Sequence, residues 1–405
     1  MKIRFRALSV GLILALTALA CAFQTPSPSQ PTANVETVVA ATLQALTPGA
    51  APVTPPPASS DVLPRTLYYL ANDNAGLLQV FRMEKDGKTV RQVTFETSEV
   101  RGFDPSPVDG SVAYVSNNQL LLINADGSNR RVLVDGGPQD VNNPFLNAVS
   151  SPVFSPNGKT LAYGFKGLNF YALDTGVSNL VIENLIENID ENFQFPRELY
   201  SPDRYSPDGS KLLVTLGYYE GASSAIYYPA GNALVRLSGG EGAAICCGEV
   251  EWTADGAALF SGSPTMGMFT SGLWRVDAAS GAVTTLLPGD PGNGTYNYAD
   301  DPYLGPDGQL YFFFANMPVT DEFISRTPLQ LVRSAPDGVT GRTVLRPDTF
   351  ELMNENLWAP DASFVIVAYA PIQDVYQGGR AEIVYLDGRP NVVLTAFALN
   401  MKWGP

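Results

Sequence analysis

Short apolar runs bounded by polar turns recur along most of the chain. Gln119 to Ile123, Thr160 to Phe165 and Leu310 to Phe314 are typical runs. Many of them begin or end next to Asp-Gly or Asn-Gly, which favour tight turns because glycine adopts positive φ without strain. Runs of this length between such turns predict β-strands joined by short hairpins. The pattern therefore predicts an all-β protein.

A longer repeat groups these strands. An aromatic-x-Pro motif, or a near relative of it, returns at roughly 50-residue intervals, about the length of one four-stranded propeller blade. Its copies are Phe103-Asp-Pro105, Phe154-Ser-Pro156, Tyr205-Ser-Pro207, Trp252-Thr-Ala254, Leu304-Gly-Pro306, Trp358-Ala-Pro360 and Trp403-Gly-Pro405. We predict a seven-bladed β-propeller of four-stranded antiparallel blades over residues 62–405, with six or eight blades as alternatives.

The two ends of this region complement each other. The first module, about 66–95, contains the second, third and fourth strands of a blade but no first strand. The last stretch, about 396–405, contains only a first strand that ends on Trp403. Pairing the two closes the ring and leaves no open sheet edge at the seam. We therefore expect the C-terminal strand to stabilise the fold and not to form a site.

The motifs also resemble a known repeat. The segments "FSPNG" from Phe154 and "YSPDG" from Tyr205, with "ADGSN" from Ala125, are similar to the TolB-like, WD40-like propeller repeat, while the copies at Trp252, Leu304 and Trp358 depart from it. The resemblance covers roughly residues 61–405. Relatives of such repeats commonly serve as protein-interaction modules, and the resemblance implies that role here. Other TolB-like propellers are uronate-polymer lyases with a histidine-bound metal, or gate a peptidase domain.

The N-terminus predicts export. Basic residues at positions 2, 4 and 6 precede an apolar run, Ala7 to Ala20, that is too short to span a bilayer. We predict a signal peptide over 1–20, and Ala18-Leu-Ala-Cys21 resembles a bacterial lipoprotein signal with Cys21 lipidated. Ordinary cleavage, giving a secreted or periplasmic protein, is the alternative. Residues 21–61 read as a Pro-rich linker with a short helix over 34–46. The expected location is a lipid anchor on the outer side of the cell membrane.

Charge and composition narrow the chemistry. The net charge of −15 argues against nucleic acid, and against membrane contact other than through the N-terminal lipid. The chain has no histidine, which removes the commonest general base, the commonest transition-metal ligand and every Ser-His-Asp or Cys-His arrangement. We therefore expect no enzyme activity and no cofactor. Ca²⁺ held by clustered carboxylates is the less favoured alternative, because no stretch has EF-hand spacing.

The long connections are predicted to share one face. In a propeller blade the turns after the first and third strands lie on one face, and here they are short. The long stretches 135–150, 183–199, 262–272, 288–301, 316–328 and 370–379 follow second or fourth strands. Long loops on a rigid scaffold commonly carry binding sites.

The candidate ligand residues of that face are polar, acidic or tyrosine side chains, which suit a protein, peptide or glycan of the cell envelope. They are Asn142, Asn143, Asp190, Glu191, Asn192, Arg197, Glu249, Tyr296, Tyr298, Asp300, Asp301, Asn354, Glu355 and Asn356.

Two adjacent cysteines, Cys246 and Cys247, are the only ones besides Cys21. Adjacent Cα atoms lie about 3.8 Å apart, below the roughly 4.4–6.8 Å usual for a disulfide. A vicinal disulfide near the channel mouth would therefore be strained, and two reduced, buried thiols are the open alternative. Without a histidine neither thiol is expected to act as a nucleophile.

These observations favour a non-catalytic, membrane-tethered binding or scaffolding protein that uses the long-loop face. Two alternatives stay open. One is a carboxylate-dependent enzyme acting on polysaccharides, which needs two carboxylates about 5–9.5 Å apart. The other is a structural component of the cell envelope.

Overall fold

The structure is a computed structural model that describes residues 61–190, 194–240, 243, 245, 250–265, 270–319 and 326–405. Residues 59–405 belong to one compact unit. Within the described ranges the regular structure consists of strands and two single-turn 3₁₀ helices, η1 (Pro144–Leu146) and η2 (Pro229–Gly231). The predicted signal peptide, linker, short helix and Cys21 lie outside these ranges. None of the described helices is long and apolar enough to cross a membrane.

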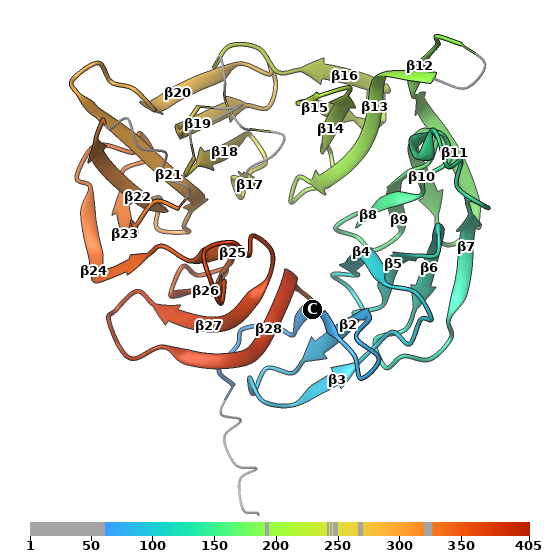
Figure 1. Cartoon of the computed structure of the whole chain (residues 1–405), viewed down its shortest axis with the longest axis horizontal. Coiled ribbons are helices and arrows are strands. Elements are labelled where there is room, and N and C mark those ends of the chain that lie inside the picture. The colour runs from blue at the N-terminus through green and yellow to red at the C-terminus, as the bar shows by residue number, and fades with distance from the viewer. Residues whose placement is uncertain are drawn as a thin grey trace, which may run out of the picture. The chain divides into compact units, whose positions relative to one another are not determined.

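The strands form antiparallel sets arranged around a common centre (Figure 1), and one strand of each set lies nearest to that centre. These inner strands are β4 (Val100–Pro105), β8 (Ser150–Phe154), β13 (Gln194–Tyr205), β17 (Val250–Trp252), β21 (Thr295–Leu304), β25 (Met353–Trp358) and the end of β28 (Val392–Trp403).

The remaining strands follow outward in each set. The second strands are β1 (Leu67–Asn72), β5 (Val112–Ser116), β9 (Thr160–Gly164), β14 (Leu212–Tyr218), β18 (Ala258–Ser263), β22 (Leu310–Pro318) and β26 (Phe364–Tyr369). The third strands are β2 (Leu78–Met83), β6 (Gln119–Ile123), β10 (Gly167–Ala172), β15 (Gly221–Tyr228), β19 (Gly272–Asp277), β23 (Leu329–Ser334) and β27 (Gly379–Tyr385). The outer strands are β3 (Val90–Gln92), β7 (Arg131–Asp135), β11 (Val177–Glu183), β16 (Ala233–Arg236), β20 (Val283–Pro288), β24 (Thr343–Phe350) and the start of β28.

Strand β28 joins the two ends of the chain. Its first half pairs with β27, for example Ala381 with Thr395, as the outer strand of the last set. Its second half pairs with β1, with Leu67 opposite Trp403 and Leu70 opposite Leu399. The predicted closure by the C-terminal strand is therefore confirmed, and one strand serves two neighbouring sets.

The all-β propeller fold is also confirmed. The hydrogen-bonded strands are connected into five sheets, because β28 links the last set to the first and Ser263 of β18 bridges to Ala299 of β21. The count of seven blades stays a prediction.

One copy of the repeat was aligned wrongly. In β4 the residue equivalent to Phe154 is Pro105, because Pro105 pairs with Val112 as Phe154 pairs with Leu161. The turn that follows begins at Ser106, whose N–H donates to the carbonyl of Ser111 at 2.7 Å. Phe103 lies two residues earlier and is buried between the first two sets. The aromatic-x-Pro match there is thus coincidental: Ser106-Pro107 is the true counterpart of Ser155-Pro156.

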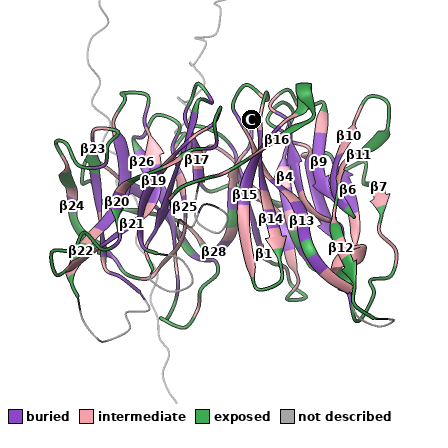
Figure 2. Cartoon of the chain, turned by 90° about the horizontal axis from the view of Figure 1, so that it is seen from above, coloured by how far each residue is buried: buried purple, intermediate pink, exposed green. Residues whose placement is uncertain are grey.

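The core consists of the contacts between neighbouring sets. Figure 2 shows buried residues along the strands and exposed residues in the connections. Because each blade packs against a neighbour on both of its faces, its second strand reads as a continuous apolar run and not as an alternating one. All five residues of β5 and the first five of β26 are buried. This double burial is why the apolar runs were so clear in the sequence.

Aspartates cap the short turns on the face opposite the long connections. In many of these turns a Ser or Thr hydroxyl donates to the carboxylate, as Thr89 does to Asp86 and Ser206 does to Asp208, both at 2.6 Å. These hydroxyl bonds lower the pKa of the capping carboxyls, to about 2 for Asp86. The same direction and leading cause apply to Asp126, Asp208, Asp255, Asp277 and Asp337.

We therefore expect the protein to lose stability in acid. Because the pKa of these carboxyls is lower in the folded chain than the usual value of 3.8, the unfolded chain binds more protons below about pH 4. Their stabilisation is complete above about pH 4 and declines as the pH falls toward 2. The melting temperature should drop by roughly 5 °C between pH 4 and pH 2.5. Asp208→Asn should weaken this dependence, and a melting temperature that stays constant over that interval would contradict the assignment.

Candidate functional site

One of the predicted long connections, 370–379, lies at one end of the central channel. A cavity of about 510 Å³ opens there. It is lined by residues from the first set (the end of β28 with β1 to β3), the second (β4 to β7), the fourth (β13 to β16) and the last (β25 to the start of β28). Glu99 and Arg101 lie on its rim, and both are exposed. Neither side chain makes a hydrogen bond or ion pair with another residue of the described ranges. Glu355 and Lys402 lie further in, so the mouth presents both signs of charge. We call this cavity, with Glu99, Arg101, Glu355 and Lys402, the channel mouth.

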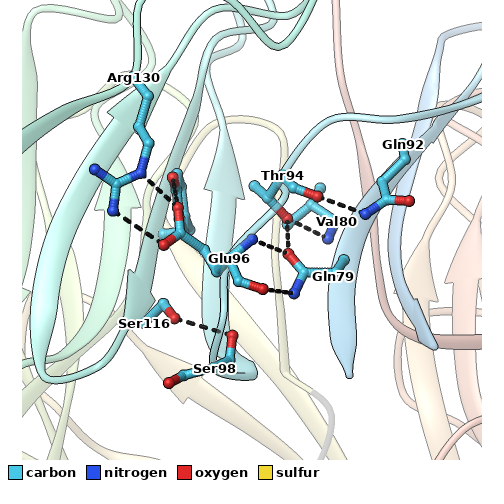
Figure 3. A network of polar contacts seen from close by, with 9 residues as sticks. Gln79, Val80, Gln92, Thr94, Glu96, Ser98, Ser116 and Arg130 are labelled. Atoms are coloured by element: carbon cyan, nitrogen blue, oxygen red, sulfur yellow. Dashed lines mark hydrogen bonds and ion pairs between the residues drawn. The ribbon is translucent and has the colours of Figure 1, made fainter. Parts of the chain in front are cut away.

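A buried polar network holds the connection that carries Glu99. Gln79 is fully buried at the start of β2 and binds both the N–H and the carbonyl of Glu96, each at 3.0 Å. Thr94 donates to the side chain of Gln79 at 2.8 Å and accepts the N–H of Val80. Figure 3 shows these bonds together with the Glu96 carboxylate turned toward Arg130. The connection between β3 and β4 is thereby fixed against both blades that flank it.

The Glu96 carboxylate is satisfied from two sides. Arg130 donates to both of its oxygens, at 2.7 and 2.9 Å, and the Tyr114 hydroxyl donates at 2.7 Å. Burial alone would raise the pKa of Glu96, but these donors outweigh it and lower that pKa. Burial and the nearby carboxylate raise the pKa of Tyr114. Glu198, Tyr200 and Arg236 repeat this arrangement in the fourth set.

Ion pairs between neighbouring inner strands line the deeper channel. Lys402 Nζ lies 2.8 Å from Asp104 Oδ1, and this ion pair joins the first set to the second. The Arg204 guanidinium lies 3.1 Å from the Asp203 carboxylate and 3.2 Å from the Glu251 carboxylate. The ion pair with Glu251 joins the fourth set to the fifth. All five residues line a cavity of about 320 Å³. The channel below the mouth is therefore polar, with its cations matched to carboxylates.

Bulges turn several inner strands at the same place. Ser151, Asp301 and Asn400 have φ near +50°, and each lies where the strand pairing shifts register. Positive φ is uncommon for residues other than glycine, and Asn and Asp tolerate it best. The sequence reasoning missed these bulges. Pro152 and Pro302, directly after two of them, are the signal that was available.

Glu355 stabilises the bulge at Asn400 through hydrogen bonds. Its carboxylate accepts the backbone N–H of Asn400 at 2.8 Å and that of Met401 as well. This predicted ligand residue therefore has a structural contact between the last and first sets, although it also faces the channel mouth.

The other predicted residues of this side lie in strands. Thr295 begins β21, so Tyr296, Tyr298 and Asp300 belong to a strand and not to a loop. Tyr298 is buried in the core, and its ring meets that of Tyr296 edge-on at 6.5 Å. The prediction that 288–301 is a loop was wrong, because polar residues that resemble turn formers, such as Asn297 and Asp301, are themselves buried in β21.

Asn354, Asp301 and Asn356 gather between the last two sets. Asn354 donates to the carbonyls of Val375 and Gly378, at 3.1 and 2.6 Å. Asn356 donates to the Asp301 carboxylate, and the Trp358 indole donates to the Asp301 carbonyl at 3.0 Å. All three predicted residues line a second cavity, of about 300 Å³.

The remaining candidates lie across the ring. Asn142 is exposed, whereas Asn143 is buried and accepts the N–H of Gln194 at 3.0 Å. Asp190 is exposed at the end of a hairpin formed by β12 (Leu185–Asn188) and β13, where the sequence predicted a loop. Arg197 pairs with Glu187 on that hairpin.

Several predictions fall outside the described residues. They are Cys21, Glu191, Asn192, Cys246, Cys247 and Glu249. The redox state of the cysteine pair stays a prediction. In the described ranges no group of three or more acidic or cysteine side chains is placed to hold a metal ion. Whether the chain binds Ca²⁺ stays untested.

Comparison with known proteins supports the fold. No protein-family model and no curated protein matches the chain. Among solved structures, TolB from Acinetobacter baumannii is 16% identical over 84% of this chain and 67% of its own, with a TM-score of 0.42. A putative TolB from Agrobacterium tumefaciens is 18% identical over 76% and 99%, with a TM-score of 0.39. A prolyl endopeptidase structure is 13% identical over 84% and 49%, with a TM-score of 0.53, so this chain spans about half of that protein.

The prediction that the chain is not an enzyme is contradicted by these neighbours. Besides the prolyl endopeptidase they include dipeptidyl peptidase 4 from Porphyromonas gingivalis and an oligogalacturonate lyase in complex with manganese, at 12–14% identity. The prolyl endopeptidase structure, with a TM-score above 0.5, shares this fold, so the fold gives no ground for excluding catalysis. At such identities the likeness concerns the fold alone. By its strand pairing, the described part of the chain has a β-propeller fold, and its likeness to solved structures concerns that fold alone.

Proposed function

We propose that this protein is an exported binding or scaffolding protein that holds a partner segment in the channel mouth. The observation that carries the proposal is the channel mouth itself. Its volume of about 510 Å³ falls in the range of roughly 300–1,000 Å³ typical of ligand sites. It is bordered by the connections that carry Glu99 and Tyr376, and binding residues are commonly found on such connections.

The chemistry of the mouth suits an extended peptide segment of a protein partner. Glu99 and Arg101 offer both signs of charge on the rim, and Leu70, Leu78 and Leu399 add apolar surface. Opposite charges on a rim steer a complementary partner and set its register. A glycan is the less suitable ligand, because it would leave the rim charges without partners.

The N-terminal sequence supports export and tethering. The basic start, the short apolar run and Cys21 together fit a lipid anchor, and the Pro-rich linker would act as a spacer between anchor and propeller. In this proposal the partner is a protein of the cell envelope that comes within reach of the tether.

Reversing the rim charges tests the proposal. The double variant Glu99→Arg with Arg101→Glu keeps the net charge and alters only exposed side chains. We expect chemical crosslinking in the native cell, followed by capture, to recover the main partner about tenfold less than with wild type. The measurement is quantitative mass spectrometry of the captured proteins.

A matched control reverses two exposed charges on the opposite face, Lys159→Glu with Asp174→Arg. This variant should recover the same partners as wild type. Equal recovery by the rim variant, or equal loss in both variants, would contradict the channel mouth as the binding site.

A further inference from the structure

The cavity of about 300 Å³ between the last two sets shares Asn354 and Tyr376 with the channel mouth, but the rest of its lining differs from that of the mouth. Pro264 and Thr265 follow β18, and Arg326 and Thr327 precede β23. Phe350, at the end of β24, completes the apolar part of the wall. Asp300 and Asp301 from β21 and Asn356 from β25 supply its polar part. We call it the acceptor cavity, for the reason that follows.

The guanidinium and amide hydrogen-bond donors of the wall are already engaged. Arg326 is nine-tenths buried, and its guanidinium donates to the carbonyls of Gln373 at 2.9 Å and Met353 at 3.2 Å. It also donates to the Asn354 side chain at 2.9 Å and to the carbonyl of Val375. Both N–H groups of the Asn354 amide point to backbone carbonyls. The Thr327 hydroxyl donates to the carbonyl of Pro264 at 3.1 Å.

The wall is correspondingly rich in acceptors. Three carboxylates, Asp300, Asp301 and Glu351, face one guanidinium among its described residues, so the lining has a net negative charge. Asn356 is nine-tenths buried, and its side-chain oxygen has no hydrogen-bond partner in the described ranges. A buried acceptor without a donor is destabilising. Asn356 lines the cavity, where a bound donor would meet this oxygen.

An aromatic side chain flanks the opening. Tyr376 is 59% exposed, and its ring lies 4.7 Å from the Arg326 guanidinium carbon. Phe350 and Leu329 are buried in the wall beside it. These side chains offer apolar contact to a short hydrocarbon chain that ends in a polar group.

We propose that the acceptor cavity binds a primary ammonium group on a short aliphatic chain, carried either by a free alkylamine or by a lysine side chain. An ammonium has three donors and no acceptor, which matches a wall of carboxylate and amide oxygens. An anion would meet three carboxylates, with the one guanidinium of the described wall already engaged. A neutral sugar would leave the negative charge of the wall uncompensated. The proposal does not rest on the channel mouth, so loss of the envelope partner there would leave it standing.

Two probes distinguish the sources of the ammonium group. Nα-acetyl-L-lysine methylamide represents the side chain, and n-butylamine represents a free amine. We expect saturable binding to the full chain by ligand-observed NMR, with a dissociation constant on the order of 1 mM for small ligands of this size. Saturation by the lysine derivative alone assigns the cavity to a protein side chain, and saturation by both assigns it to alkylammonium groups in general. The Nε-acetylated lysine derivative, which has no charge, should not bind.

Asp301→Asn removes the buried charge while keeping a residue that tolerates positive φ, and we expect it to weaken binding at least tenfold. Asp374→Asn, an exposed carboxylate on the connection 370–378 that does not line the cavity, is the matched control and should bind as wild type. Tyr376→Ala, at an exposed position, serves as a second variant in case Asp301→Asn folds poorly, and should also weaken binding. Equal binding of the acetylated derivative, unchanged binding by both cavity variants, or no saturation by either amine would overturn the proposal.

Discussion

Removing Leu399 to Pro405 should lower the melting temperature by about 10 °C or more. These residues form the half of β28 that pairs with β1. Their loss exposes the edge of β1, where Tyr68 and Leu70 are buried, and opens the ring. It also removes the ion pair of Lys402 with Asp104 and the bond from the Trp403 indole to the Trp358 carbonyl, both 2.8 Å long. The cut leaves the half of β28 that completes the last set intact.

Differential scanning calorimetry of the full and shortened chains measures the effect. A peptide with the sequence of residues 399–405 should restore part of the melting temperature by adding as a strand to β1. A scrambled peptide of the same composition is the control. A shortened chain that melts within about 2 °C of the full chain would mean that the ring is closed by other contacts.

The closure could be predicted because it depends on a count of strands. A first module without its first strand and a chain end with only that strand complement each other whatever the details of packing. The register of the β4 copy could not be predicted in the same way. Phe103 matches the aromatic of the repeat, but the turn begins at Ser106, and only the pairing of Pro105 with Val112 shows this.

The sequence predicted the candidate site less completely than the fold. The face was predicted from connection lengths, but among the described lining residues of the channel mouth only Tyr376, Gln377 and Gly378 come from a predicted long connection, 370–379. The roles of individual residues were not predictable, because they depend on partners far away in sequence. Glu355 binds the amides of Asn400 and Met401, and Arg326 binds carbonyls on the connection 370–378. Glu99 and Arg101 had no distinguishing motif at all. For the ion pairs of the deeper channel a signal was available and was missed. Arg204 and Lys402 are charged residues that stand directly before an aromatic position of the repeat.

Replacing Trp358 by alanine is expected to destabilise the fold by about 3–5 kcal/mol, the usual cost of deleting a buried tryptophan. Trp358 is 6% exposed at the centre of the contact between the last two sets. Its ring stacks on Tyr303, with ring centres 5.6 Å apart, and lies within 5.9 Å of Tyr311 and 6.2 Å of Phe313. Urea unfolding followed by circular dichroism measures the change in midpoint and slope.

Trp358→Phe separates packing from hydrogen bonding. Phenylalanine keeps most of the ring contacts but cannot donate to the Asp301 carbonyl, now bonded at 3.0 Å. That carbonyl would be left without its donor, at a cost of about 1–3 kcal/mol. Phe95→Ala, at a position 71% exposed, is the control and should change stability by less than about 0.5 kcal/mol. If Trp358→Ala and Phe95→Ala cost the same, the aromatic of the repeat would not hold the blades together. Asp301 also lines the acceptor cavity. Trp358→Phe should therefore weaken amine binding even under conditions where the variant is fully folded.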